Sequence, residues 1–237
     1  MTADAPAIVV AEKGSPPQYY RFSALISGFA RMWRAWRVTG PVIVVNAVVQ
    51  ALLIIPSTGG TFSTPVFLLT AFASAVVMLA AAAVVVAGSL QSPTGTVTWA
   101  ATLERIRGNL LPFVLWTVAL FLVVLVGLSF GTWPGLLLAA IFPYLLIAAM
   151  AGDRNAVGAN FRVIAARPFR WAITMLIIGV IAALIWLGFA LLWFFVPGVV
   201  GAIVASLVGG LLTWWWCTAL ACVYLSVRTG QPTDGHR

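Results

Sequence analysis

The chain has very few of the residues that usually carry out chemistry. Its 237 residues include five acidic side chains, one histidine and two cysteines. His236 lies in a polar tail, so no histidine-based triad, metal cluster or general base can form within the fold. Cys217 and Cys222 are five residues apart on different faces of one apolar segment, which suits neither a disulfide nor a metal site. No phosphate-binding glycine loop, HExxH pair or Gly-x-Ser-x-Gly elbow occurs, and we therefore expect no enzyme activity, catalytic residue, cofactor or metal.

Charge of either sign is also scarce. Charged residues make up 8% of the chain and hydrophobic residues 62%, with a mean hydropathy of +1.08. This composition cannot fold around one core in water, and it indicates a membrane protein. A helix needs roughly 20 apolar residues to cross about 30 Å of hydrocarbon. Six segments approach that length and are predicted to span the membrane: Gly40 to Ile55, Pro65 to Gly88, Leu110 to Gly131, Pro134 to Ala151, Trp171 to Val196 and Gly198 to Val227.

None of the six predicted spans contains Asp, Glu, Lys, Arg or His. Proton relays and ion-coupled pumps usually keep such residues at membrane depth, where they are costly and functional, so these two classes are disfavoured. The most polar intramembrane residues are Asn46 and Gln50, four positions apart on one face of the first span. Their amides could hydrogen-bond a substrate, or they could pair with a neighbouring helix, as Asn and Gln commonly do.

The basic residues predict the orientation of the chain. They precede the first span, separate the second from the third and the fourth from the fifth, or follow the sixth, and the other three connections carry no charge. Under the positive-inside rule, both termini of this multi-pass protein are cytoplasmic. Glu104 and Asp153 are each expected to pair with a neighbouring arginine rather than with each other.

A basic amphipathic stretch leads into each of the three pairs of spans. In the first stretch, Phe29, Trp33 and Trp36 fall on one helical face, and Arg31 and Arg34 fall on the opposite one. Such a helix lies in the plane of the membrane, with its aromatic rings at headgroup depth. We therefore predict an all-α bundle of three units, each consisting of an in-plane helix, a span, a short outer turn and a second span.

These basic stretches have two explanations. Arginine and tryptophan anchor nearly any multi-pass protein at its cytoplasmic boundary, but they could also bind anionic lipid or a partner specifically. Each basic residue near an anionic surface contributes about 1 kcal/mol. The candidate lipid-binding residues are Arg31, Trp33, Arg34, Trp36, Arg37, Arg105, Arg107, Arg162, Arg167 and Arg170.

Small residues and one proline predict how the spans pack. Gly127 and Gly131 form a GxxxG pair, which permits close backbone approach near the centre of the bundle or in a homodimer. Pro143 removes a backbone donor inside the fourth span and is expected to kink it. The successive residues Trp214 to Trp216 point around the last span, and we expect them at the membrane interface or against lipid.

The chain is expected to form one membrane domain between two tails. Residues 1–20 are rich in Ala, Pro and Gly and are predicted to form a disordered cytoplasmic tail, and residues 230–237 form a second cytoplasmic tail. The transmembrane domain covers residues 21–229, in units 21–88, 89–151 and 152–229.

The six predicted spans, the in-plane helices and a last span ending in Tyr224-Leu225-Ser226-Val227-Arg228 resemble a known membrane domain. This layout is similar to the six-helix membrane domains attached to some bacterial glycerophosphodiester phosphodiesterases and to their stand-alone relatives, over roughly residues 21 to 229. In those enzymes a separate soluble metal-binding domain performs the hydrolysis, so the resemblance implies a membrane module without catalysis. The excess of arginine over lysine, with abundant Ala, Val and Gly, also resembles actinobacterial proteins, and the two resemblances together imply a location in a bacterial inner (plasma) membrane.

Two functions follow as hypotheses. The first is a non-catalytic module that packs against a membrane partner or a second copy, or that organises anionic lipid at the cytoplasmic face. The second is a small permease, or permease subunit, for an uncharged or lipid-like substrate. A permease would need a water-accessible cavity that reaches the midplane beside Asn46 and Gln50. No nucleic-acid partner is expected.

Overall fold

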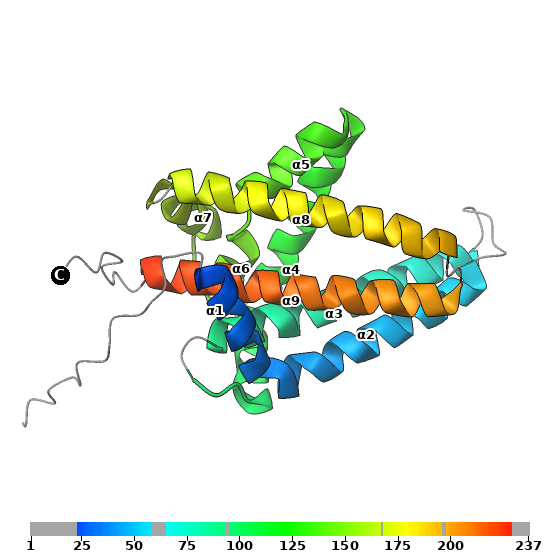
Figure 1. Ribbon diagram of the computed structural model, residues 1–237. Coiled ribbons are helices and arrows are strands. Elements are labelled where there is room, and N and C mark those ends of the chain that lie inside the picture. The colour runs from blue at the N-terminus through cyan, green and yellow to red at the C-terminus, as the bar shows by residue number, and fades with distance from the viewer. Residues whose placement is uncertain (1–22, 58–64, 93–94, 167, 196–197, 229–237) are drawn as a thin grey trace, which may run out of the picture.

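Helices make up every element in the part of the chain that the structure describes. The computed structural model describes residues 23–57, 65–92, 95–166, 168–195 and 198–228 (Figure 1). The elements are α1 (Ser23–Met32), the 3₁₀ turn η1 (Trp33–Ala35), α2 (Trp36–Ser57), α3 (Pro65–Gln91), α4 (Trp99–Ser129), α5 (Thr132–Ile141), α6 (Leu145–Met150), α7 (Ala156–Ala166), α8 (Pro168–Phe195) and α9 (Val199–Arg228). The all-α prediction is confirmed, while the predicted tails lie outside the described residues.

Among the described residues, four helical stretches are long and apolar enough to cross a membrane. They are Gly28–Leu53, Pro65–Gln91, Trp99–Ser129 and Val199–Arg228, and they overlap the first, second, third and sixth predicted spans over most of their length. Helix α7 and residues Trp171–Ile181 of α8 meet the same criterion only when taken together, across a bend of 98°. Large apolar side chains such as Leu69, Leu111 and Phe121 are exposed along these helices, and a surface of that kind requires lipid around it.

The fourth predicted span is broken into two helices. Helix α5 ends at Ile141, α6 begins at Leu145, and Pro143 lies between them. Phe142, the residue before the proline, has φ −113° and ψ 40° and so leaves the helical conformation. Proline removes a backbone donor and disfavours a helical residue before it, which explains a break at this point. The distortion expected at Pro143 is confirmed, but the segment is not one continuous helix.

The helices that precede the spans differ among the three units. Helix α1 and η1 lead into α2, and in Figure 1 α1 crosses over the last part of α9. Helix α7 is likewise separate and bends sharply into α8. In the second unit no separate helix forms, because α4 runs without interruption from Trp99 to Ser129, starting at the Thr98 cap, whose hydroxyl accepts from the Ala101 N–H.

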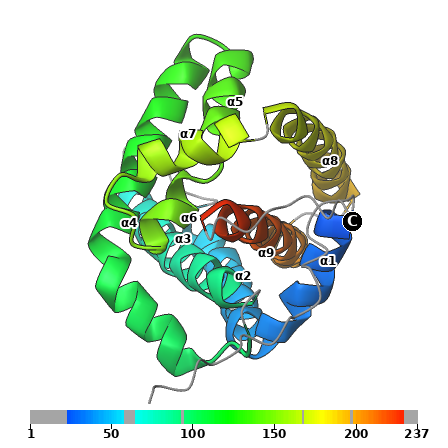
Figure 2. The same ribbon diagram turned by 90° about the vertical axis from the view of Figure 1, so that its left-hand side faces the viewer.

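Helices α2, α3 and α9 pack together and form the centre of the structure. Helix α8 lies beside α9, whereas α4 runs across these helices and pairs with α5 in a hairpin that packs against α3 and α6 (Figures 1 and 2). One buried cluster, which includes Phe113 and Tyr144, joins α3, α4, α6, α7 and α9. A second, which includes Met32, Val38 and Trp214, joins α1, η1, α2, α3 and α9.

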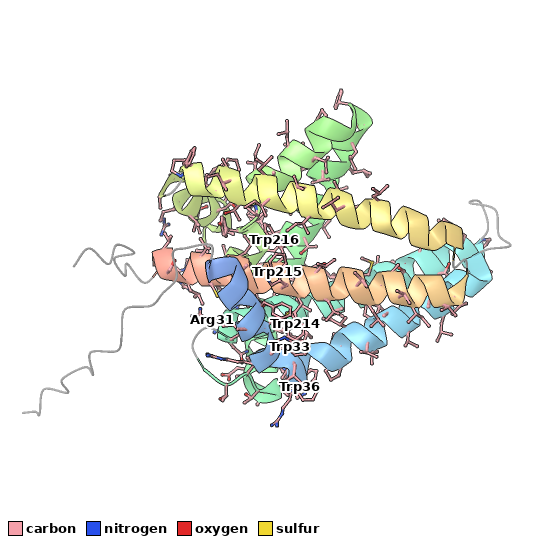
Figure 3. The ribbon with its side chains drawn as sticks, in the orientation of Figure 1. Arg31, Trp33, Trp36, Trp214, Trp215 and Trp216 are labelled. Carbon is pink, nitrogen blue, oxygen red and sulfur yellow. The ribbon has the colours of Figure 1, made fainter. Side chains whose placement is uncertain are left out.

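The placement expected for Trp214 is wrong. Its side chain is 1% exposed and belongs to the second buried cluster rather than to the lipid-facing surface. Trp215 and Trp216 are partly buried, and Figure 3 shows the three side chains on different sides of α9. Helices α1 and α2 cover the side of α9 on which Trp214 lies. The apolar side chain of Trp214 therefore packs against protein and not against lipid.

Glycine permits close contact within the α4–α5 hairpin. A Cβ atom on Gly127 would lie 2.6 Å from Leu138 Cδ1 and 2.9 Å from Gly135 Cα, so the two backbones meet only because both positions lack side chains. Gly131, with φ +135°, lies at the turn between the helices. The close approach predicted from the GxxxG pair therefore occurs inside the hairpin and not at the centre of the bundle.

We expect Gly127→Ala to destabilise the protein by about 1 to 3 kcal/mol, because the added methyl would force the hairpin apart. Gly108→Ala on the same helix is the matched control, since a Cβ there meets nothing within 4 Å. Thermal unfolding of both variants in detergent measures the difference. Equal melting temperatures for the two variants would contradict the packing described for the hairpin.

Candidate functional site

The charged side chains of the described chain gather at one end of the structure. They lie on α1, η1 and the first residues of α2, at the start of α4, between α6 and α7, on α7, and at the end of α9. We call this the charged end, and it faces the viewer in Figure 2. Its members are Arg31, Arg34, Arg37, Glu104, Arg105, Arg107, Asp153, Arg154, Arg162 and Arg228.

Helix α1 packs against α9 through its small residues. Gly28 is buried opposite Ala219, where an added Cβ would be 3.4 Å from the Ala219 Cβ, and Met32 and Ala35 continue the buried face. Arg31 is partly buried on the same side, and its guanidinium donates to Cys222 Sγ at 3.3 Å. Arg31 therefore connects α1 to α9. The helical pattern had predicted that Arg31 lies on the water-facing side, and that prediction is wrong.

The aromatic residues of this segment point away from the protein. Phe29, Trp33 and Trp36 are each 52% exposed, and the rings of Phe29 and Trp33 meet edge to face with centroids 6.1 Å apart. Arg34 and Arg37 are exposed beside them, and Figure 3 shows where Trp33 and Trp36 lie along this segment. We call these five residues the α1 surface. All five side chains are exposed within residues 29–37, whereas Gly28, Met32 and Ala35 of the same segment are buried.

The remaining predicted lipid-binding residues lie away from the α1 surface. Arg105 is partly buried at the start of α4, while Arg107 on α4 and Arg162 on α7 are exposed. The side chains of Arg167 and Arg170 lie outside the described residues. The predicted set therefore divides between the α1 surface and a second group of arginines on α4 and α7.

A polar contact joins α9 to the connection between α6 and α7. Asp153 accepts a hydrogen bond from the Tyr224 hydroxyl and forms an ion pair with Arg228, Oδ1 to Nη2 3.1 Å. Arg228 also donates to the carbonyl of Ala151 at 3.2 Å. Tyr224 and Arg228 are one turn apart on α9, so both can reach the same carboxylate.

The sequence analysis expected Asp153 to pair with an arginine close to it in sequence. The structure shows a different partner. Its partner Arg228 comes from the far end of the chain, and the pair is partly exposed, with side-chain exposures of 23% and 44%. Exposed ion pairs contribute about 1 kcal/mol or less, whereas a hydrogen bond to a charged group contributes about 1.5 to 3 kcal/mol. The bond from the buried Tyr224 is therefore the stronger of the two contacts.

A buried asparagine closes the break at Pro143. The Asn160 side chain, on α7, donates to the Ile141 carbonyl at 2.9 Å and accepts from the Tyr144 N–H at 3.0 Å. Both backbone groups flank the proline and lose their helical partners there. Asn160 is fully buried, so α7 is held against the ends of α5 and α6 by two hydrogen bonds. The sequence analysis had given Asn160 no role. A polar residue four positions before Ile164, on the apolar face of α7, was the feature of the sequence that could have indicated a buried hydrogen-bonding role.

Helix α4 completes this region, which we call the α4–α6–α7–α9 junction. It comprises Arg105 and Asn109 of α4, Gly152 and Asp153 after α6, Asn160 and Arg162 of α7, and Tyr224 and Arg228 of α9. Gly152 has φ +81°, and a Cβ there would be 3.0 Å from Asn109 Oδ1, so glycine allows the turn to pass under α4.

Gln50 connects α2 to α3. The Gln50 amide donates to the Ser74 carbonyl at 3.1 Å, and the Ser74 hydroxyl donates to Gln50 Oε1 at 2.5 Å. These two bonds are the interhelical pairing that the sequence left as one of two alternatives, whereas Asn46 accepts from the Gln50 amide within α2, Oδ1 to Nε2 3.5 Å. Among the described residues, no three His, Cys, Asp or Glu side chains lie close enough together to hold a metal ion.

Comparison with protein-family models, with curated proteins and with solved structures finds no match to this chain. The resemblance to the membrane domains of glycerophosphodiester phosphodiesterases therefore stays a prediction. Two residues of the segment on which that resemblance was based have a physical role in the structure, because Tyr224 and Arg228 both contact Asp153.

We expect Asn160→Ala to lower the free energy of unfolding by more than 2 kcal/mol, because it leaves a buried N–H and a buried C=O without partners, at about 1 to 3 kcal/mol each. Asn109→Ala is the matched control, since the Asn109 amide bonds to the Arg105 carbonyl of its own helix. Denaturation in mixed detergent micelles measures both variants. A similar loss in the two would show that Asn160 does not hold the break together.

Proposed function

We propose that the protein is a non-catalytic membrane module that organises anionic lipid at the cytoplasmic face through the α1 surface. The observation that carries this proposal is the exposure of Phe29, Trp33 and Trp36 together with Arg34 and Arg37 in one short segment. Tryptophan and phenylalanine favour the headgroup region, and arginine adds attraction to anionic phosphate groups. Packing of α1 and α2 against α9 holds this segment in place, so a lipid would meet a formed surface rather than a mobile loop.

The pairing of Gln50 with Ser74 favours a packing module over a permease. The amide that a substrate would need is already bonded to α3, and releasing it would break two interhelical hydrogen bonds. Ala47 and Ala51 of α2 and Ala83 of α3 are also buried, so small apolar side chains pack inside the bundle. Packing against a membrane partner or a second copy remains the alternative role of the same module.

The proposal keeps the six-span topology in a bacterial inner membrane, with both termini cytoplasmic. In support, the start of α1 and the end of α9 lie at the same end of the structure, as an even number of crossings requires (Figure 1). The charged side chains gather at that end, as the positive-inside rule expects. In this topology α5 with α6 and then α8 provide the fourth and fifth crossings, and the α4–α5 hairpin crosses at a tilt to the other spans.

We expect a cysteine introduced at Ser57 to react with a membrane-impermeant thiol reagent added to whole cells, because it would lie at the outer surface. A cysteine at Arg154 should react only after the cells are opened. Labelling of a Cys217→Ala and Cys222→Ala background, which removes the native thiols, checks both positions. Reaction of the two positions from the same side would overturn the topology.

We expect the wild-type protein, purified from its own cells in native nanodiscs, to retain anionic phospholipid above its share in the bulk membrane. Replacing Arg34 and Arg37 by Gln should lower the affinity about thirtyfold, since each arginine contributes about 1 kcal/mol. The control is Arg107→Gln with Arg154→Gln, which removes the same charge from other exposed positions. Lipid and protein mass spectrometry measures the retained molecules.

Two results would overturn the lipid proposal. One is equal anionic-lipid content in the wild type, the α1 variant and the control variant. The other is a stoichiometric membrane protein that co-purifies without lipid enrichment, which would make the chain an accessory subunit.

A further inference from the structure

Helix α7 lies across the end of the bundle instead of along it. It meets residues Trp171–Ile181 of α8 at an angle of 98°, and α8 runs beside α9, one of the stretches long enough to cross a membrane (Figure 1). A helix nearly perpendicular to such a span lies close to the plane of the bilayer. Because α7 is part of the charged end, the proposed topology places it at the level of the phospholipid headgroups.

One face of α7 is buried against the protein. Its buried residues recur every three or four positions, as one face of a helix requires, and they are Ala156, Ala159, Asn160 and Val163. The two hydrogen bonds from Asn160 to the backbone of Ile141 and Tyr144 hold this face against the end of α5 and the start of α6. Helix α7 is therefore fixed in place, and its other face is the one that a ligand can reach.

The opposite face of α7 carries an aromatic ring beside a positive charge. Phe161, Arg162 and Ala165 are exposed, and they share this face because Ala165 follows the other two by four and three positions. We call these three residues the α7 surface. The ring of Phe161 also meets the ring of Phe142 edge to face, with centroids 5.7 Å apart, so it is held beside the break between α5 and α6.

The segment around Arg162 supplies no negative charge of its own. Residues 154–233 contain neither aspartate nor glutamate, and Asp153, directly before them, is engaged by Tyr224 and Arg228. The α7 surface therefore complements an anionic surface. A helix in the membrane plane with an aromatic ring next to arginine matches the interface of a bilayer, where the ring meets the acyl boundary and the guanidinium meets phosphate.

We propose that the α7 surface binds anionic phospholipid as a second lipid contact, separate from the α1 surface. Helices α1 and α7 lie on different sides of α9 in Figure 2, so the charged end meets the headgroup layer at two places. This inference rests on the proposed function for its topology, and it adds a binding surface from another part of the chain. Two contacts around α9 would fix the tilt of the bundle as well as enrich anionic lipid around it.

A spin label at Ala165 tests where α7 lies. The label is attached to Ala165→Cys in full-length protein that also carries Cys217→Ala and Cys222→Ala, and the protein is placed in nanodiscs. Its relative accessibility to oxygen and to a water-soluble nickel complex should report headgroup depth. A label at Leu115→Cys, which is exposed well inside the α4 span, should report hydrocarbon depth. Equal depth for the two labels, or full access of the nickel complex to Ala165→Cys, overturns the placement.

Lipid binding is measured with full-length protein in nanodiscs of phosphatidylcholine with added phosphatidylglycerol, in which native mass spectrometry counts bound phosphatidylglycerol. Arg162→Gln should lower the affinity about fivefold, the equivalent of about 1 kcal/mol for one arginine at an anionic surface. Arg162→Lys keeps the charge and should retain most of the binding. Arg107→Gln removes the same charge from an exposed position outside both surfaces and should match the wild type.

Combined variants distinguish the two lipid contacts. For separate surfaces, the loss in Arg162→Gln should add to the loss in Arg34→Gln with Arg37→Gln. A loss in the α7 variant alone would leave the α7 surface standing and contradict the α1 proposal, and a loss in the α1 variant alone would do the reverse. Unchanged binding in Arg162→Gln, or an equal reduction in Arg107→Gln, overturns the second contact.

Discussion

The pairing of Asn160 with the backbone at Pro143 is the interaction on which the second half of the fold depends. Within a membrane, a backbone N–H or C=O without a partner costs several kcal/mol, and a proline in a helix creates such groups. Asn160 satisfies the Ile141 carbonyl and the Tyr144 N–H together, so the chain can turn at α5 and α6 instead of continuing as one span. The turn then brings Asp153 to α9 and places α7 across the end of the bundle.

Polar contacts of this kind determine which helices pack together, because apolar side chains in lipid do not distinguish one helix face from another. A leucine gains little by leaving hydrocarbon for another helix, so helix faces are chosen by shape and by hydrogen bonding. The shape component is visible where Gly28 meets Ala219 and where Gly127 meets Gly135. The hydrogen-bonding component is visible between Gln50 and Ser74 and between Asp153 and Tyr224.

The charged end brings these two components together. Gly28 and Ala35 lie on the buried side of the segment formed by α1 and η1, while the residues of the α1 surface, on α1, η1 and the start of α2, are exposed. On the other side, Asp153 joins the connection after α6 to Tyr224 and Arg228 of α9. The arrangement of the charged end thus depends on how helices pack, although the residues involved lie far apart along the chain.

The sequence by itself determined where apolar helices lie, where Pro143 interrupts one of them, and where charge is concentrated, because each of these follows from local composition and periodicity. It also identified Arg34, Arg37, Trp33 and Trp36 as one group. Only the tertiary structure decided that Arg31 and Trp214 face protein, that residues 99–109 of α4 continue into its span, and that Asp153 selects Arg228 over nearer arginines. An amphipathic pattern shows which residues share a face, but what meets that face depends on close fit and hydrogen bonding with residues distant in sequence.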